Sequence, residues 1–163
     1  MAHKIRQAST FDLPEIIALE NEAFGARGTA ESSAVIESRL KVFPEGCLVV
    51  ESNGKTIGYA SSEKWSQEYE PLLDIDPFAR HAKNGHMFCI SSFAIRLTHR
   101  GKGFGLFLLD HLIEIARHHS CAAMILSTVQ AQEFYSKRGF QITASLLKPN
   151  SNIALTVMKL DLK

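Results

Sequence analysis

The chain has 163 residues, of which 45% are hydrophobic, and carries a formal net charge of +1 at pH 7. This length suits one domain with a buried core, so we expect a single domain over residues 1–163. The near-neutral charge provides no basic excess to hold a phosphate backbone, which argues against nucleic acid as a partner. No apolar stretch has the length of a signal peptide core or a membrane span, so we expect a cytoplasmic protein that does not bind membranes.

The three cysteines, Cys47, Cys89 and Cys121, are widely spaced and form no CxxC pair. They indicate buried free thiols rather than a disulfide framework or a zinc site. His111 and His118 lie on a predicted helix without other ligands at metal-binding spacing. We therefore predict no metal.

The N-terminal half predicts two helices followed by a hairpin. A helix-starting pattern at Thr10 and apolar residues at helical spacing predict a first helix that ends near Gly25. A second helix is expected over residues 30–42, where a following proline stops it. Asn53-Gly54 is a strong hairpin signal because both central residues of a type I′ turn need positive φ, so two antiparallel strands should flank it.

The C-terminal half alternates predicted strands and helices after an irregular segment over residues 66–85. A strand leads into a glycine-rich loop, which opens an apolar helix over residues 104–118. The elements expected after the irregular segment are, in order, the strand HMFCISSFAIRL, the loop RGKGFG and its helix, the strand CAAMILST, the short helix AQEFYSKRGF, and the strands ITASLL and NIALTVMKLDL.

The irregular segment carries four acidic residues, Glu68, Glu70, Asp74 and Asp76. Near the mouth of a site they would attract a cationic amine, although a solvated loop explains them equally well. Trp65 and Tyr69 could offer an apolar face to an aromatic amine, and packing is the competing interpretation.

Gly101, Gly103 and Gly105 lie between a predicted strand and a predicted helix. Free backbone amides and the positive end of the helix dipole make such a junction suitable for a phosphate or pyrophosphate, while a simple tight turn is the alternative. The loop is not a Walker loop, because neither Lys-Ser nor Lys-Thr follows the last glycine. It is not GxGxxG either, because Leu108 stands three residues after Gly105.

The spacing Arg100-x-x-Gly103-x-Gly105 matches the pattern that GNAT enzymes place at this junction. FYSKRGF, which contains Tyr135, resembles the FYxKxGF signature of the same superfamily. The chain therefore resembles GNAT superfamily N-acetyltransferases over nearly its whole length. This resemblance implies a mixed α/β fold with a bent, mostly antiparallel sheet of six or seven strands flanked by about four helices. The strand before the loop would splay from its neighbour and open a cofactor cleft.

The resemblance implies that acetyl-CoA is the cosubstrate. The amides of the glycine loop would hold its pyrophosphate, and the strand before the loop would pair with the pantetheine arm like an added strand. The residues implied in cofactor binding are Phe93, Ala94, Ile95, Arg100, Gly101, Lys102, Gly103, Phe104, Gly105 and Phe134.

Within the superfamily, the stretches RLKVFPEGCLVV, HAKNGHMFCISSFAI and EFYSKRGFQI resemble arylalkylamine N-acetyltransferases and their microbial relatives. Animal members of that group carry two histidines on the strand before the loop. This chain has Cys89 and Ser91 at the matching positions, and neither acts as a histidine does at neutral pH. The resemblance therefore supplies no general base.

Acetyl transfer from a thioester to an amine needs a neutral amine, a polarised carbonyl and a proton for the departing thiolate. Tyr135 matches the signature tyrosine, and its phenol could donate that proton or a hydrogen bond to the sulfur. For the base, the candidates are Glu63, His86 and Ser91, the last as part of a water relay. The sequence does not rank them, and each has an ordinary structural interpretation.

The sequence thus predicts an N-acetyltransferase that moves the acetyl group of acetyl-CoA to a primary amine by direct attack. The expected acceptor is a small arylalkylamine or polyamine. Alternatives are acetylation of a protein N-terminus or lysine, and a non-catalytic CoA-binding module. A nucleotide-binding domain that uses the glycine loop alone fails to explain FYSKRGF. The oligomeric state stays open, a homodimer included.

Overall fold

The structure, a computed structural model, describes residues 2–163. Its centre is a seven-stranded sheet in the order β1-β2-β3-β4-β5-β7-β6. The strands are β1 (His3–Gln7), β2 (Leu48–Ser52), β3 (Lys55–Trp65), β4 (Met87–Ile95), β5 (Ala123–Thr128), β6 (Gln141–Leu147) and β7 (Ala154–Asp161). The helices are α1 (Leu13–Phe24), α2 (Ser33–Val42), α3 (Pro77–Arg80), α4 (Phe104–His118) and α5 (Gln132–Ser136).

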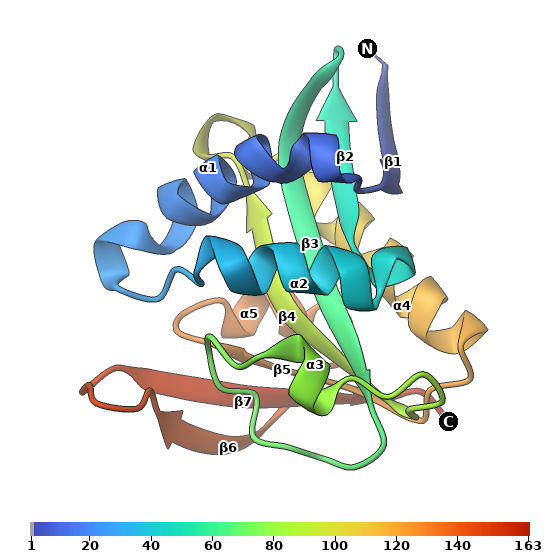
Figure 1. Cartoon of the computed structure of the whole chain (residues 1–163), viewed down its shortest axis with the longest axis vertical. Coiled ribbons are helices and arrows are strands. Elements are labelled where there is room, and N and C mark those ends of the chain that lie inside the picture. Colours follow the sequence, from blue (N-terminus) through green and yellow to red (C-terminus); the bar gives the residue numbers. More distant parts are fainter. Residues whose placement is uncertain (1) are drawn as a thin grey trace.

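The sheet is bent, and β1–β4 run steeply across the direction of β6 and β7 (Figure 1). Every neighbouring pair is antiparallel except β4 and β5, which pair in parallel. That parallel pairing covers only residues 87–89 of β4 and residues 123–125 of β5. Beyond Cys89 the two strands have no mutual pairing, so the sheet opens between them.

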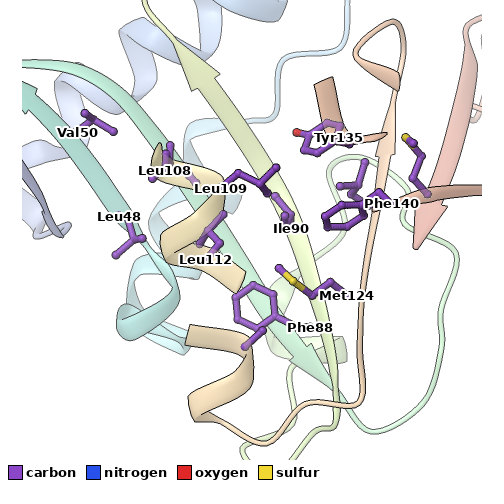
Figure 2. Close-up of a cluster of buried hydrophobic side chains, with 14 of the residues drawn as sticks. Leu48, Val50, Phe88, Ile90, Leu108, Leu109, Leu112, Met124, Tyr135 and Phe140 are labelled. Atoms are coloured by element: carbon purple, nitrogen blue, oxygen red, sulfur yellow. The ribbon is translucent and has the colours of Figure 1, made fainter. Parts of the chain in front are cut away.

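Helices cover both faces of the sheet. α1 and α2 lie on the face nearer the viewer in Figure 1, and α4 lies on the opposite face. The larger core cluster packs α4 against the sheet, with Phe88, Leu108, Leu112 and Met124 buried at its centre (Figure 2). A second cluster packs α1 and α2 against the other face, so both faces of the central strands are buried.

The mixed α/β fold expected from the sequence is confirmed, with seven strands and with five helices instead of about four. The hairpin turn is also confirmed, because Asn53 and Gly54 have φ of 50° and 75°. The long apolar helix runs over residues 104–118 as predicted. Strand β1 was not predicted, because its HKIRQ sequence has a single apolar residue and forms an edge strand.

The irregular segment over residues 66–85 contains one short helix, α3, whose first turn is capped by the side chain of Asp76. Cys47, Cys89 and Cys121 are free and buried. Across residues 2–163, no helix combines the length and apolar character needed to span a bilayer.

Candidate active site

A cavity of about 590 Å³ occupies the opening between β4 and β5. Its walls come from the end of α1 and the loop after it, the second half of β4, the glycine loop, the end of β5, and α5. The splayed strands therefore leave a cleft that reaches from the start of α4 to the end of α1.

The glycine loop forms one end of this cavity, which Gly101 and Gly103 line. Their φ angles of 72° and 90° lie in the left-handed region, where a side chain is strained. Apart from the adjacent residues, no heavy atom of residues 2–163 lies within 4 Å of where their Cβ atoms would be, so a ligand can approach the backbone closely. Gly103 is also the N-cap residue of α4, whose first amides have no partner within the helix. This arrangement fits the pyrophosphate of CoA.

The unpaired edge of β4 continues the cavity wall from the glycine loop, with Phe93, Ala94 and Ile95 lining it. Arg100 also lines the cavity, and its Nε donates to the carbonyl oxygen of Ile95 at 2.8 Å. This bond fixes the loop to the end of the strand. A free strand edge beside the amide cradle suits an extended pantetheine arm.

Two residues that the sequence places at the cofactor do not line the cavity. Lys102 is exposed, and Phe104 packs edge-on against His3 at a centroid distance of 5.4 Å. Phe134 does line the cavity, and it fills the space beside Gly105, where a Cβ atom would lie 3.0 Å from its ring. Gly105 thus allows the Phe134 ring to pack closely against the backbone and does not leave space there for a ligand.

Tyr135 lines the cavity from α5. Its ring packs among buried apolar side chains, including Phe140, while its oxygen projects from the edge of that cluster (Figure 2). Its Oη makes no hydrogen bond with residues 2–163. Burial raises the pKa of the Tyr135 phenol, so it stays protonated at neutral pH. The structure thus brings an available proton donor to the cleft.

A bulge in β4 places two neighbouring serines on the same face of the sheet. The register with β3 shifts between Ser61 and Ser62, which leaves Ser91 without a paired residue. Both Ser91 and Ser92 line the cavity. Ser92 bonds to Glu20 on α1, and Ser91 bonds to Glu63 on β3, whose carboxylate also binds Arg39 of α2. In a regular strand they would point to opposite faces.

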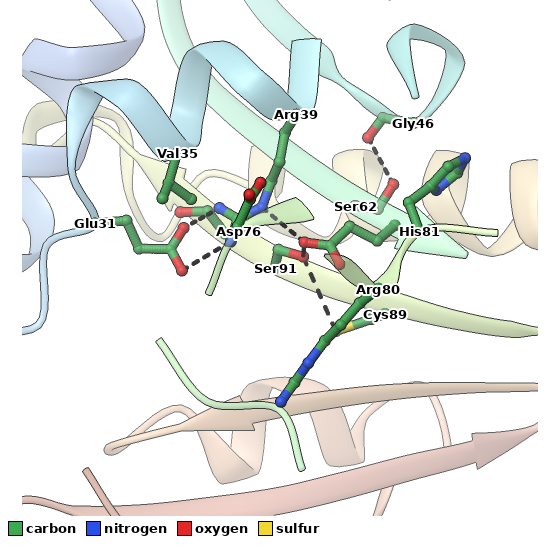
Figure 3. A network of polar contacts seen from close by, with 12 residues as sticks. Glu31, Val35, Arg39, Gly46, Ser62, Asp76, Arg80, His81, Cys89 and Ser91 are labelled. Atoms are coloured by element: carbon green, nitrogen blue, oxygen red, sulfur yellow. Dashed lines mark hydrogen bonds and ion pairs between the residues drawn. The ribbon is translucent and has the colours of Figure 1, made fainter. Parts of the chain in front are cut away.

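Ser91 leads to a buried ion-pair network (Figure 3). Its Oγ donates to Glu63 Oε1 at 3.3 Å, and Arg39 Nε donates to the same oxygen at 3.1 Å. The Arg39 guanidinium also binds both carboxylate oxygens of Glu31, and Trp65 Nε1 donates to Glu63 Oε2 at 2.8 Å. Arg39 is only 2% exposed, so two carboxylates and one guanidinium share a dry site.

Ser92 leads to a second buried carboxylate, that of Glu20 on α1. Ser92 Oγ donates to Glu20 Oε1 at 2.5 Å, and Tyr59 Oη donates to the same oxygen. The amide of Glu31 donates to Glu20 Oε2 at 2.8 Å. Burial raises the pKa of Glu20 above its ordinary value, and Glu20 lines the cavity.

The remaining base candidates do not reach the cavity. His86 is exposed and precedes β4, at the end where β4 and β5 are still paired. Glu63 stands behind Ser91 and does not line the cavity. Only Ser91, of the three residues considered from the sequence, lies on its wall.

Of the two interpretations of the acidic loop residues, attraction of a cationic amine at the mouth of a site is not supported, because the loop residues make other contacts. Asp74 accepts from the amide of Ser32 at 2.9 Å, Asp76 caps α3, and Glu68 pairs with Lys159. None of these acidic side chains lines the cavity.

Trp65 and Tyr69 pack edge-on against each other, with centroids 5.3 Å apart. The Arg80 guanidinium lies over both rings. They make a packing cluster and do not line the cavity. No three ligand-type side chains within residues 2–163 are placed to hold a metal ion.

Sequence reasoning missed Glu20, Glu31, Tyr59 and Ser92. One signal was present: Glu20 follows Ile16 and Leu19 at helical spacing, so a carboxylate occupies the apolar stripe of α1. A charged residue on a buried stripe needs partners, and those partners lie far away in the sequence.

A sheet opened by one short parallel pair, with an amide cradle at a helix start and a phenol in the cleft, is suited to a transferase with a phosphate-bearing cosubstrate. The chain belongs to the Acetyltransferase (GNAT) family, which matches residues 13–140. It is an acetyl-CoA-dependent N-acetyltransferase, with acetyl-CoA as its cosubstrate.

Similar proteins agree with this family. The chain is 27% identical to an L-methionine sulfoximine/L-methionine sulfone acetyltransferase of Pseudomonas aeruginosa, over 99% of this chain and 96% of the relative. The protein yncA from Salmonella typhimurium, solved with its cofactor acetyl-CoA, has 25% identity and a TM-score of 0.72 over 100% of this chain and 95% of that one. The loading GNATL domain of CurA from Lyngbya majuscula has 15% identity and a TM-score of 0.86, over 99% and 98% of the two chains.

Proposed function

We propose that the protein acetylates the primary amine of a small molecule of the amino-acid type. The observation that carries this proposal is the pairing of opposite charges at the α1 end of the cavity. Glu20 and Glu31 line it together with Arg27, so an ammonium and a carboxylate can each find a partner there. An amino acid has both groups on one carbon.

Segments near the cavity are joined by hydrogen bonds, which favours a small acceptor over a polypeptide. Lys148 Nζ, beyond β6, donates to the carbonyl oxygen of Gly28 at 2.5 Å. Ser127 Oγ on β5 donates to the carbonyl oxygen of Pro71 at 2.6 Å. A polypeptide acceptor would need an open groove between these segments.

The side-chain hydroxyl of Thr29 is a further polar group at the cavity. It lines the cavity and is only 5% exposed. Its Oγ1 is buried and has no hydrogen-bond partner among residues 2–163. Because an unpaired buried hydroxyl costs free energy, a polar acceptor that bonds to Thr29 would gain affinity.

The chemistry follows from this placement. The glycine loop would hold the pyrophosphate, and the edge of β4 over residues 93–95 would direct the pantetheine arm toward Tyr135. The neutral amine attacks the thioester carbonyl carbon, the C–S bond breaks, and the phenol of Tyr135 supplies a proton to the departing thiolate. The new amide nitrogen releases one N–H proton to solvent, and Tyr135 regains a proton from solvent.

The methionine sulfoximine/sulfone acetyltransferase supports an acceptor of the amino-acid type, because that relative matches nearly the whole chain. The arylalkylamine acceptor inferred from short sequence stretches has no comparable support. Trp65 and Tyr69, the residues considered for an aromatic amine, pack against each other and do not line the cavity.

The test is CoA release and product mass over an acceptor panel: L-methionine sulfone, its carboxamide, tryptamine, spermidine and a short peptide with a free N-terminus. We expect L-methionine sulfone to react with the highest kcat/KM. The variant Arg27→Gln should raise KM for the amino acid roughly tenfold and leave KM for the carboxamide nearly unchanged, because only the former offers a carboxylate. Turnover of the peptide alone, or equal effects on both acceptors, would contradict the proposal.

A further inference from the structure

Three side-chain oxygens meet at one point beside the cavity: Glu20 Oε1, Tyr59 Oη and Ser92 Oγ. The Ser92 oxygen lies 2.5 Å from that of Glu20 and 2.6 Å from that of Tyr59, and Tyr59 is hydrogen-bonded to Glu20. From these contacts we infer that Glu20 takes up the proton that the acceptor amine loses, an inference that rests on the proposed acetylation of an amine.

The number of hydrogens in this cluster supports a proton-accepting role. Three oxygen–oxygen contacts need three hydrogens, and the hydroxyls of Tyr59 and Ser92 supply only two. The third is present only when Glu20 is protonated. An ionised Glu20 therefore leaves one close contact without a hydrogen, and uptake of one proton completes the ring.

The electrostatic surroundings of Glu20 agree with this role. Burial raises the pKa of its carboxyl, while bonds from Ser92 and Tyr59 and the charge of Arg39 lower it to a smaller extent. From α2, the Arg39 charge is already shared between Glu31 and Glu63. Arg27, in the turn after α1, is exposed and lines the cavity. Within residues 2–163, Glu20 therefore forms no ion pair with a cation.

The other carboxylates near the cavity are less suited to the task. Both oxygens of Glu31 bind the guanidinium of Arg39. Glu63 accepts from Arg39, Ser91 and Trp65, and it does not line the cavity. Glu20 alone, of these three, lines the cavity and has its side chain bonded only to neutral donors.

The proton balance is simple. The acceptor enters as an ammonium, and one N–H proton passes to Glu20 Oε1, directly or through the Ser92 hydroxyl, leaving a neutral amine. That amine forms the C–N bond as the C–S bond breaks, and Tyr135 protonates the departing thiolate. The new amide nitrogen then releases its second N–H proton to solvent, from which Tyr135 regains a proton. Glu20 returns its proton to solvent after the product leaves, so the carboxylate is regenerated.

The first test is Glu20→Gln, with Glu15→Gln as the matched control, because Glu15 lies on the same helix and pairs with Arg96 at the surface. The side-chain amide of the glutamine can accept from the backbone amide of Glu31 and donate to the Ser92 and Tyr59 oxygens, so the hydrogen bonds of the cluster are kept. We expect kcat to fall roughly 10²-fold. In a plot of kcat against pH, the decrease toward low pH (the acidic limb) should disappear. The KM for acetyl-CoA should be unchanged, and Glu15→Gln should behave as wild type.

Stability against pH supplies a readout that needs no acceptor. A carboxyl whose folded-state pKa is raised stabilises the fold below its unfolded pKa, and that stability is lost as pH rises through the folded pKa. We therefore expect Glu20→Gln to raise Tm above wild type at pH 8, with a smaller difference at pH 5. A residue with a purely structural role would give a lower Tm at both pH values.

Ser92→Ala provides a second variant. Loss of the Ser92 hydrogen bond removes a donor that favours the ionised form, so the acidic limb of kcat should move to higher pH. If wild type acetylates acceptors but Glu20→Gln retains its kcat and pH profile, or Ser92→Ala leaves the limb unmoved, only the assignment of Glu20 is overturned. If wild type acetylates no amine, the proposed function fails and this assignment fails with it.

Discussion

Replacing Tyr135 with phenylalanine is expected to lower kcat roughly 10²-fold, because the departing thiolate loses its proton donor. The Tyr135 ring packs against Phe93, Phe134 and Phe140, and phenylalanine keeps these contacts. The Tyr135 hydroxyl bonds to none of the residues that the structure describes, so no partner is left unsatisfied. Steady-state kinetics with saturating acceptor measure the effect.

The Kd for acetyl-CoA should change little in Tyr135→Phe, since the cofactor contacts assigned to β4 and the glycine loop remain. Phe140→Leu is a suitable control, because Phe140 packs against the same ring but does not line the cavity. A Tyr135→Phe enzyme with the kcat of wild type would remove the phenol from the mechanism.

Replacing Arg39 with methionine is expected to destabilise the fold by about 3–5 kcal/mol. Arg39 is 2% exposed and is the shared partner of Glu31 and Glu63, so its loss leaves two buried carboxylates without a counter-charge. For a domain of this size the corresponding fall in Tm is roughly 6–20 °C. Urea unfolding at constant m-value measures the change.

Lys41→Met is the matched control for Arg39→Met. Lys41 lies on the same helix and pairs with Glu37 at the surface, 3.4 Å away, so its loss should cost about 0.5 kcal/mol or less. The addition of Glu63→Gln to Arg39→Met should restore part of the stability, because it removes one of the two unpaired charges. A loss below about 1 kcal/mol in Arg39→Met would show that this network is not needed for the fold.

The sequence predicted best what lies in short windows. The Asn53-Gly54 turn, the helix after the glycine loop and the cavity position of Tyr135 each depend on neighbouring residues or on a local motif. Backbone torsion and helix periodicity are local properties, so a single sequence contains the information for them.

The polar contacts of the site could not be predicted from the sequence, because they join residues that are far apart in the chain. Glu20 meets Tyr59 39 positions later and Ser92 72 positions later, and no short pattern joins them. The β4 bulge that turns Ser91 and Ser92 to one face arises from its register with β3. The acidic residues that are close together in the sequence fitted a cation-attracting loop and a solvated loop equally well, whereas Asp74 and Asp76 accept hydrogen bonds from backbone amides at helix starts.

Thermal unfolding with and without acetyl-CoA tests the central claim most directly. A ligand at 100 times its Kd that binds only the folded state stabilises it by about 2.7 kcal/mol, and for this size Tm should rise by roughly 5–10 °C. Gly103→Ala, which forces a side chain onto a φ of 90°, should weaken this rise at equal ligand concentration. An unchanged wild-type Tm at millimolar acetyl-CoA would contradict the assignment of the cleft to this cosubstrate.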